Sequence, residues 1–110
     1  MSLIDKKCVP CRGGVPPLTT EETQKYLKEL KIEWQVTDNK KISREFKFKS
    51  FREAMDFVNK VAEVAEKEDH HPDMKISYRK VVMELTTHAI GGLSENDFIM
   101  ARKIEELAGD

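Results

Sequence analysis

Hydrophobic and polar residues alternate along this chain with two different periods, and these periods divide it into helices and strands. Apolar residues that recur every three to four positions predict helices, and strict alternation predicts half-buried strands. The pattern predicts, in order, a helix over 19–31, strands over 34–37 and 42–48, a helix over 50–71, strands over 74–78 and 81–88, and a helix over 94–108.

Local signals support these boundaries. Each predicted helix begins with a Ser or Thr followed three residues later by an acid, which is the spacing of a capping box. The pairs are Thr19 with Glu22, Ser50 with Glu53, and Ser94 with Asp97. Pro72 must end the second helix by His71, because a residue before proline is pushed out of the helical region. The run 38–40 (Asp-Asn-Lys) predicts a hairpin turn between the first two strands.

The element order α-β-β-α-β-β-α predicts an α+β fold, with a four-stranded antiparallel sheet and three helices packed on one face. Residues 1–18 contain Gly13-Gly14 and Pro16-Pro17, so we expect an N-terminal arm there and a single domain over 19–110. A sheet of this kind has open edges, so pairing with a second copy of the chain is expected.

Composition narrows the functional classes. The net charge of the 110 residues is −1, with acids and bases interspersed, so no basic face is expected and nucleic acid is not an expected partner. No apolar run approaches the roughly 20 residues of a membrane span, and no secretory signal is visible. We therefore expect a cytoplasmic protein without a membrane partner.

The two cysteines, Cys8 and Cys11, form a C-x-x-C pair in the expected arm. One such pair is at most half of a zinc site, and the glycines and prolines that follow do not fit the helix start of a thioredoxin-like motif. Reduced thiols in an arm, an intersubunit disulfide and a shared metal all remain open.

All three histidines fall between Glu66 and Asp97, and we expect them at the ends of elements. His70 and His71 close the second helix, and His88 ends the fourth strand, where strand parity places it with Thr86 on the face away from the helices. Imidazole can donate or accept a proton near neutral pH, so acid–base catalysis is one interpretation. A zinc site is a second, although adjacent histidines diverge on a helix and argue against it.

Each residue also has a purely structural interpretation. His70 could interact with the dipole at the helix end, Asp97 could be only the partner of the Ser94 cap, and Glu66 could be one more solvated acid. We expect Tyr78 to be packed. The joint arrangement of these residues is what favours a site.

That arrangement resembles the signature of the pterin-4a-carbinolamine dehydratases in residue type and spacing. The matching pattern is Glu66-x3-His70-His71-Pro72-x5-Tyr78-x9-His88-x8-Asp97. The neighbouring Asp69, Thr87 and Gly92-Leu93-Ser94-Glu95 are similar to the family as well, and Cys8-x-Pro10-Cys11 resembles the arm of many bacterial members.

The resemblance implies dehydration of a 4a-hydroxytetrahydropterin, without metal or organic cofactor, in recycling of a tetrahydrobiopterin-type cofactor. His70 and His88 would act as acid and base, and His71 would hold the pterin. Glu66 would orient His70, and Asp97 would support His88 or the pterin. The implied substrate-binding residues are Asp69, His70, His71, Thr86, Thr87, His88 and Ala89.

The resemblance also implies a homodimer or a dimer of dimers. Two other functions stay open at this level. The chain could act on another pterin, for example a molybdopterin-related one. It could also be a non-catalytic dimerisation or binding module, since the resemblance includes animal members that also act as a dimerisation cofactor.

Overall fold

The helices and strands follow one another in the order α-β-β-α-β-β-α, which confirms the fold expected from the sequence. The computed structural model describes residues 3–9 and 15–109. Its elements are η1 (Leu3–Asp5), α1 (Thr20–Leu27), β1 (Gln35–Thr37), β2 (Lys41–Lys47), α2 (Phe51–Glu68), β3 (Asp73–Ser77), β4 (Lys80–Leu85), η2 (His88–Ile90) and α3 (Glu95–Leu107).

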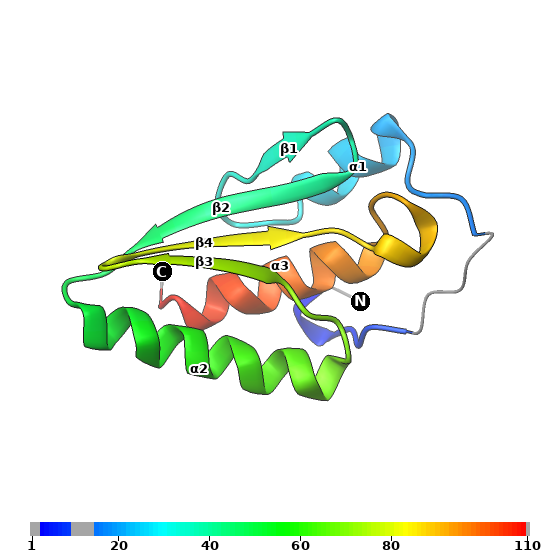
Figure 1. Cartoon of the computed structure of the whole chain (residues 1–110). Helices are drawn as coiled ribbons and strands as arrows, with labels where there is room; N and C mark the ends of the chain where they lie inside the picture. The colour runs from blue at the N-terminus through cyan, green and yellow to red at the C-terminus, as the bar shows by residue number, and fades with distance from the viewer. Residues whose placement is uncertain (1–2, 10–14, 110) are drawn as a thin grey trace.

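The four strands form one antiparallel sheet in the order β1-β2-β4-β3. Strand alternation turns Val81, Met83 and Leu85 of β4 to one face, where all three are fully buried. Figure 1 shows α2 and α3 side by side along that face. Burying one face of the sheet against these helices makes the single core of the protein.

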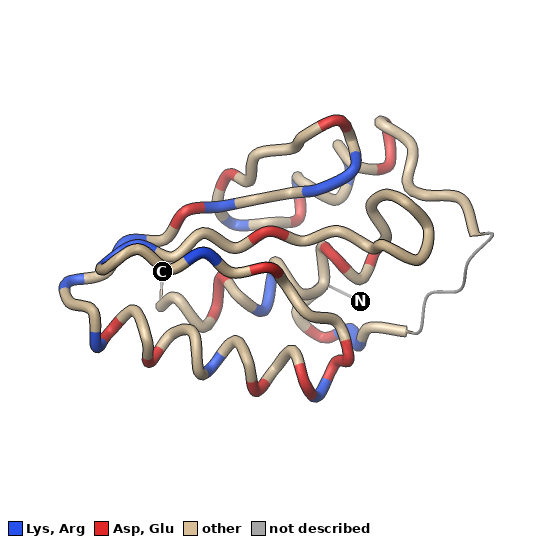
Figure 2. Tube along the Cα trace, in the orientation of Figure 1, with Lys and Arg blue, Asp and Glu red and all other residues tan. Residues whose placement is uncertain are grey.

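The first helix joins this core through aromatic packing. Tyr26 of α1 stacks on Phe98 of α3, with ring centroids 5.3 Å apart. Along α2, acidic and basic residues are interspersed (Figure 2). No helix in the described ranges 3–9 and 15–109 is long and apolar enough to cross a membrane.

The first helix is shorter than predicted, because it ends at Leu27 and not near Lys31. The carboxylate of Glu105 on α3 accepts hydrogen bonds from the backbone N–H groups of Lys31 and Ile32, at 2.9 and 3.0 Å. It also accepts one from the indole N–H of Trp34 at 2.9 Å. In a longer helix these backbone N–H groups would bond within the helix. Because they bond to the buried Glu105 instead, the helix ends earlier.

Two predicted strand ends are also wrong. β3 ends at Ser77, and Tyr78 lies in the following turn with a φ of 54° and 67% of its surface exposed, so the expected packing of Tyr78 is wrong. β4 ends at Leu85, because Thr87 bridges to Gly92 and His88 enters η2. His88 therefore lies beyond the sheet, and the parity argument that placed it on the open face does not apply.

The described part of the N-terminal region, residues 3–9, packs on the domain. The side chain of Leu3 is 1% exposed and belongs to the core. The ammonium group of Lys103 on α3 donates to the carbonyl of Ile4 at 3.1 Å, and Lys6 pairs with Glu95 at 2.7 Å. Cys11 lies outside the described residues, so the alternatives for the C-x-x-C pair stay open.

Candidate active site

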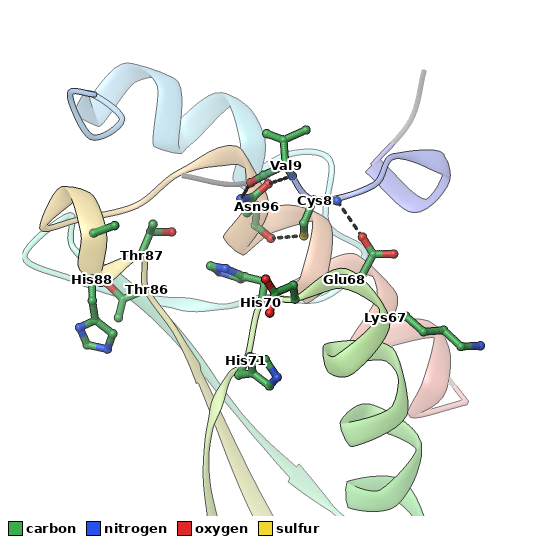
Figure 3. A pocket seen from close by; sticks show the side chains of 12 residues that line it. Cys8, Val9, Lys67, Glu68, His70, His71, Thr86, Thr87, His88 and Asn96 are labelled. Carbon is green, nitrogen blue, oxygen red and sulfur yellow. Dashed lines mark hydrogen bonds between the residues drawn. The ribbon is translucent and has the colours of Figure 1, made fainter. Parts of the chain in front are cut away.

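A pocket of about 590 Å³ opens where the C-terminal end of α2, the segment after β4, the start of α3 and the N-terminal segment meet. The seven residues that the resemblance implies as substrate-binding all line it: Asp69, His70, His71, Thr86, Thr87, His88 and Ala89. Figure 3 shows His88 on one side of this pocket and His70 and His71 on the other. The structure thus brings the three imidazoles to one cavity.

The end of α2 sets the direction of His70. Asp69 caps the helix in the left-handed conformation (φ 53°, ψ 40°), and the backbone N–H of His70 donates to the carbonyl of Ala65 at 3.2 Å. A left-handed residue at this position reverses the chain and ends the helix. His70 therefore leaves the helical path, and its side chain turns toward the pocket and α3.

His70 is held by a buried carboxylate. Its Nε2 lies 2.6 Å from Oδ1 of Asp97, and the two side chains are 12% and 0% exposed. With Asp97 as a carboxylate, Nε2–H is the donor in this bond. The other ring nitrogen, Nδ1, has no protein partner in the described part of the chain. A histidine that is fixed through one nitrogen and free at the other can accept or deliver a proton.

Asp97 is fixed in turn by its second oxygen. Oδ2 accepts the Thr87 hydroxyl at 2.9 Å and the backbone N–H of Ser94 at 3.0 Å. The Thr87 and Ser94 hydroxyls lie 2.8 Å apart. The carboxylate therefore caps α3, as the sequence predicted, and at the same time orients His70. Both interpretations of Asp97 therefore hold: Oδ2 caps α3, and Oδ1 orients His70.

The other carboxylate pairs differently from what was expected. Oε2 of Glu66 lies 2.6 Å from Nε2 of His71, so Glu66 orients His71 and the expected Glu66–His70 bond is wrong. The expectation assumed that α2 continues to His70, but the helix ends at Glu68. This pair is open to solvent, with His71 54% and Glu66 78% exposed. It is therefore a weaker support than the buried pair of Asp97 and His70.

His88 is the least constrained of the three. It begins η2, between Thr87 and the left-handed Gly91, and is exposed. In the described ranges its ring has no hydrogen-bond or ion-pair partner. Asp97, which was expected to support either His88 or the pterin, is bonded to His70. His88 is free to bond to a molecule in the pocket.

Five further residues line the pocket that the sequence did not point to: Cys8, Val9, Lys67, Glu68 and Asn96. Burial and the neighbouring Glu68 raise the pKa of the Cys8 thiol from 9.0 to about 12. Cys8 therefore presents an uncharged thiol at neutral pH. Asn96 could have been suspected from its place beside Asp97, but no local pattern connects Cys8 and Val9 to the histidines.

The described residues contain no group of three or more His, Cys, Asp and Glu side chains arranged to hold a metal ion. The two imidazoles with carboxylate partners use separate acids, Asp97 and Glu66. What the arrangement can do chemically is bind a polar molecule and exchange protons with it at two places in the pocket, His70 and His88.

Comparison with known proteins agrees with this picture. The profile of the family described as "Pterin 4 alpha carbinolamine dehydratase" matches residues 16–107. A protein from Nitrosomonas eutropha is 57% identical over 105 residues, which are 96% of this chain and 92% of that protein. Its name assigns it provisionally to the pterin-4-alpha-carbinolamine dehydratases.

Two solved structures are similar in fold. A transcriptional coactivator/pterin dehydratase from Brucella melitensis superposes with a TM-score of 0.79 at 41% identity, covering 84% of this chain and 99% of that one. A pterin dehydratase-like protein, identified as a RuBisCO assembly factor in the alpha-carboxysome, has a TM-score of 0.60 at 22% identity, covering 71% and 89%, and shares the fold. The family profile and the extent of sequence identity show that this chain belongs to the pterin 4 alpha carbinolamine dehydratase family.

Proposed function

We propose that this protein dehydrates a 4a-hydroxytetrahydropterin, with His70 and His88 as the acid–base pair. The observation that carries the proposal is the geometry of His70, which lines the pocket and is held through Nε2 by the fully buried Asp97. In a family of dehydratases, an imidazole fixed in this way is suited to proton transfer.

The reaction removes the hydroxyl group on C4a and the hydrogen on N5 of the pterin. A general acid protonates the hydroxyl, the C4a–O bond breaks and water leaves. A general base takes the proton from N5, and a C4a=N5 double bond forms, giving the quinonoid dihydropterin. The step needs one proton donor and one proton acceptor, and imidazole side chains can fill both roles.

The two histidines lie on opposite sides of the pocket, which suits proton exchange with two different groups of the pterin (Figure 3). His70 is oriented before substrate binds, whereas His88 has no partner in the described residues and would be oriented by the substrate. His71, supported by Glu66 in solvent, would mainly position the pterin. Thr86, Thr87 and Ala89 would contact it along the segment after β4.

Stopped-flow measurement of the dehydration of a synthetic 4a-hydroxytetrahydropterin tests the proposal directly. Replacing His70 or His88 by Ala should lower turnover by ~10²–10⁴-fold, the usual contribution of a general acid or base. Replacing His71 by Ala should raise KM more than it lowers kcat, because its role is binding. Wild-type protein that gives no acceleration over buffer would refute the dehydratase function.

The physiological role extends the proposal to recycling of a tetrahydrobiopterin-type cofactor in the cytoplasm, by a homodimer or homotetramer. Measuring kcat/KM for pterins with different substituents would separate this role from one on a molybdopterin-related substrate. A protein that binds a partner without accelerating any dehydration would instead be a binding module.

A further inference from the structure

The N-terminal segment 3–9 reaches the pocket, although it is distant from every catalytic residue in the sequence. It lies outside residues 16–107, which the family profile matches. Leu3 anchors its beginning in the core, with 1% of its surface exposed. Cys8 and Val9, at the other end of the segment, line the pocket.

Asn96, in the first turn of α3, hydrogen-bonds this end of the segment through both the oxygen and the nitrogen of its side-chain amide. Its Oδ1 accepts the backbone N–H of Val9 at 3.0 Å, and its Nδ2 donates to the carbonyl of Val9 at 2.5 Å. The side chain is almost completely buried, with the residue 4% exposed. An amide that matches a backbone donor and acceptor at once fixes both position and orientation of that residue.

A second contact holds the segment from α2. Oε1 of Glu68, in the last turn of that helix, accepts the backbone N–H of Cys8 at 2.7 Å. The Cys8 thiol donates to the carbonyl of Asn96, with sulfur and oxygen 3.6 Å apart. Figure 3 shows the Cys8 side chain directed between Asn96 and Glu68, on the side of the pocket where His70 lies. The segment thus joins the two helix ends that carry His70 and Asp97.

We propose that segment 3–9 is a fixed wall of the substrate pocket, and that Asn96 is the positioning residue that holds it there. The wall contributes to substrate binding and leaves the proton transfers to the histidines. Its Cys8 side chain adds an uncharged, weakly polar surface next to His70, which suits the flat face of a heterocycle better than water does. The part of this proposal that concerns substrate rests on the dehydratase function.

The first experiment measures whether the segment is docked, and it needs no enzymatic activity. In a Cys11→Ser background Cys8 is the only thiol, since the chain has two cysteines. At pH 8, iodoacetamide should alkylate it roughly 10²-fold more slowly than a free cysteine, because the raised pKa lowers the thiolate fraction by more than the stronger nucleophilicity of that thiolate restores. Asn96→Ala should raise this rate more than tenfold. Glu68→Ala would raise the rate even in a docked segment, because Glu68 itself raises the pKa of the Cys8 thiol, so Asn96→Ala is the variant that reports docking.

The matched control is Asn59→Ala, which removes an exposed amide from the middle of α2. It should leave the alkylation rate unchanged. Thermal unfolding of each variant identifies any that loses the fold. Because the Asn96 side chain is not among the groups that raise the Cys8 pKa, faster alkylation in Asn96→Ala would report release of the segment. A wild-type rate equal to that of free cysteine would overturn the proposal, as would an unchanged rate in Asn96→Ala.

The second experiment tests whether segment 3–9 contributes to substrate binding or only stabilises the fold. With a 4a-hydroxytetrahydropterin as substrate, Asn96→Ala should raise KM by roughly 5- to 10-fold, the equivalent of one lost contact at tenfold per 1.4 kcal/mol. Because the histidines are unaffected, kcat should change much less. A fall in kcat with unchanged KM would refute the wall. Absence of turnover in wild type refutes the dehydratase function instead, and alkylation then decides the docking alone.

Discussion

Replacing Asp97 by Asn tests whether the buried carboxylate controls the chemistry of His70. The substitution exchanges one oxygen for an NH₂ group and keeps the side chain's shape. Oδ2 of Asp97 accepts two donors, the Thr87 hydroxyl at 2.9 Å and the Ser94 N–H at 3.0 Å. The single oxygen of the introduced amide should therefore stay on that side, and its NH₂ group should face Nε2 of His70.

This orientation reverses the proton arrangement of the imidazole. Nε2 must now accept, so the proton of neutral His70 moves to Nδ1, and a second proton on Nε2 would point at the amide NH₂. His70 can then no longer act as a base through Nδ1 or be stabilised as a cation. An acid–base contribution is worth ~10²–10⁴-fold, and we expect turnover to fall by at least ~10²-fold.

The stability change should be smaller than the change in activity. A charge-assisted hydrogen bond contributes about 1.5–3 kcal/mol and a neutral one about 0.5–1.5 kcal/mol, so the substitution should cost about 1–2 kcal/mol. For a domain of this size that corresponds to a decrease in Tm of roughly 4–8 °C. The variant should remain folded at 25 °C, where turnover is measured.

Glu66→Gln is the matched control, because it makes the same carboxylate-to-amide change beside His71. That pair has the same 2.6 Å separation but is 54% and 78% exposed. Exposed ion pairs contribute under about 1 kcal/mol, so Tm and kcat should change little. Stopped-flow kinetics measures kcat of both variants, and thermal unfolding measures their Tm. Wild-type turnover in folded Asp97→Asn, or equal losses in the two variants, would refute the reasoning.

Two further predictions concern groups that take no part in the proton transfer. Glu105→Gln leaves one acceptor oxygen for three N–H donors, so it should destabilise the fold by about 2–3 kcal/mol in urea unfolding and shift the fluorescence of Trp34. The control, Glu106→Gln at the neighbouring exposed residue, should have a far smaller effect on both. Equal effects of the two substitutions would contradict the prediction. Because the pKa of Cys8 is raised from 9.0 to about 12, its contribution to stability is complete below pH 9 and is lost as the pH rises toward 12. Urea unfolding at pH 8 and pH 10.5 should therefore show a smaller alkaline loss for Cys8→Ser than for wild type, and parallel losses would count against it.

Much of the fold was predictable because its signals are local. Hydrophobic periodicity depends on neighbouring residues, and the Thr19–Glu22 capping box formed as the spacing indicated. The hairpin turn at Asp38 and Asn39 adopts the left-handed backbone expected of these residues, with φ values of 52° and 54°. One error came where a distant group competed, because Glu105 bound the backbone that would have extended α1.

The site shows the same division. From the sequence alone, three histidines and two acids could be placed at the ends of elements, and seven of the residues now found along the pocket could be named from the family resemblance. The sequence could not decide which acid serves which imidazole. That depended on where α2 ends, since the left-handed Asp69 sends His70 toward Asp97 and leaves Glu66 to His71.

The amino-acid sequence by itself determined the order of the elements, the faces that are buried and the capping of α3 by Asp97, because these follow from residues within a few positions of one another. Only the tertiary structure decided that the free oxygen of Asp97 meets His70, 27 positions away, and that the N–H of Cys8 meets Glu68, 60 positions away. Such contacts form when packing brings distant segments together, and a buried polar group then pairs with whichever partner lies within hydrogen-bond distance.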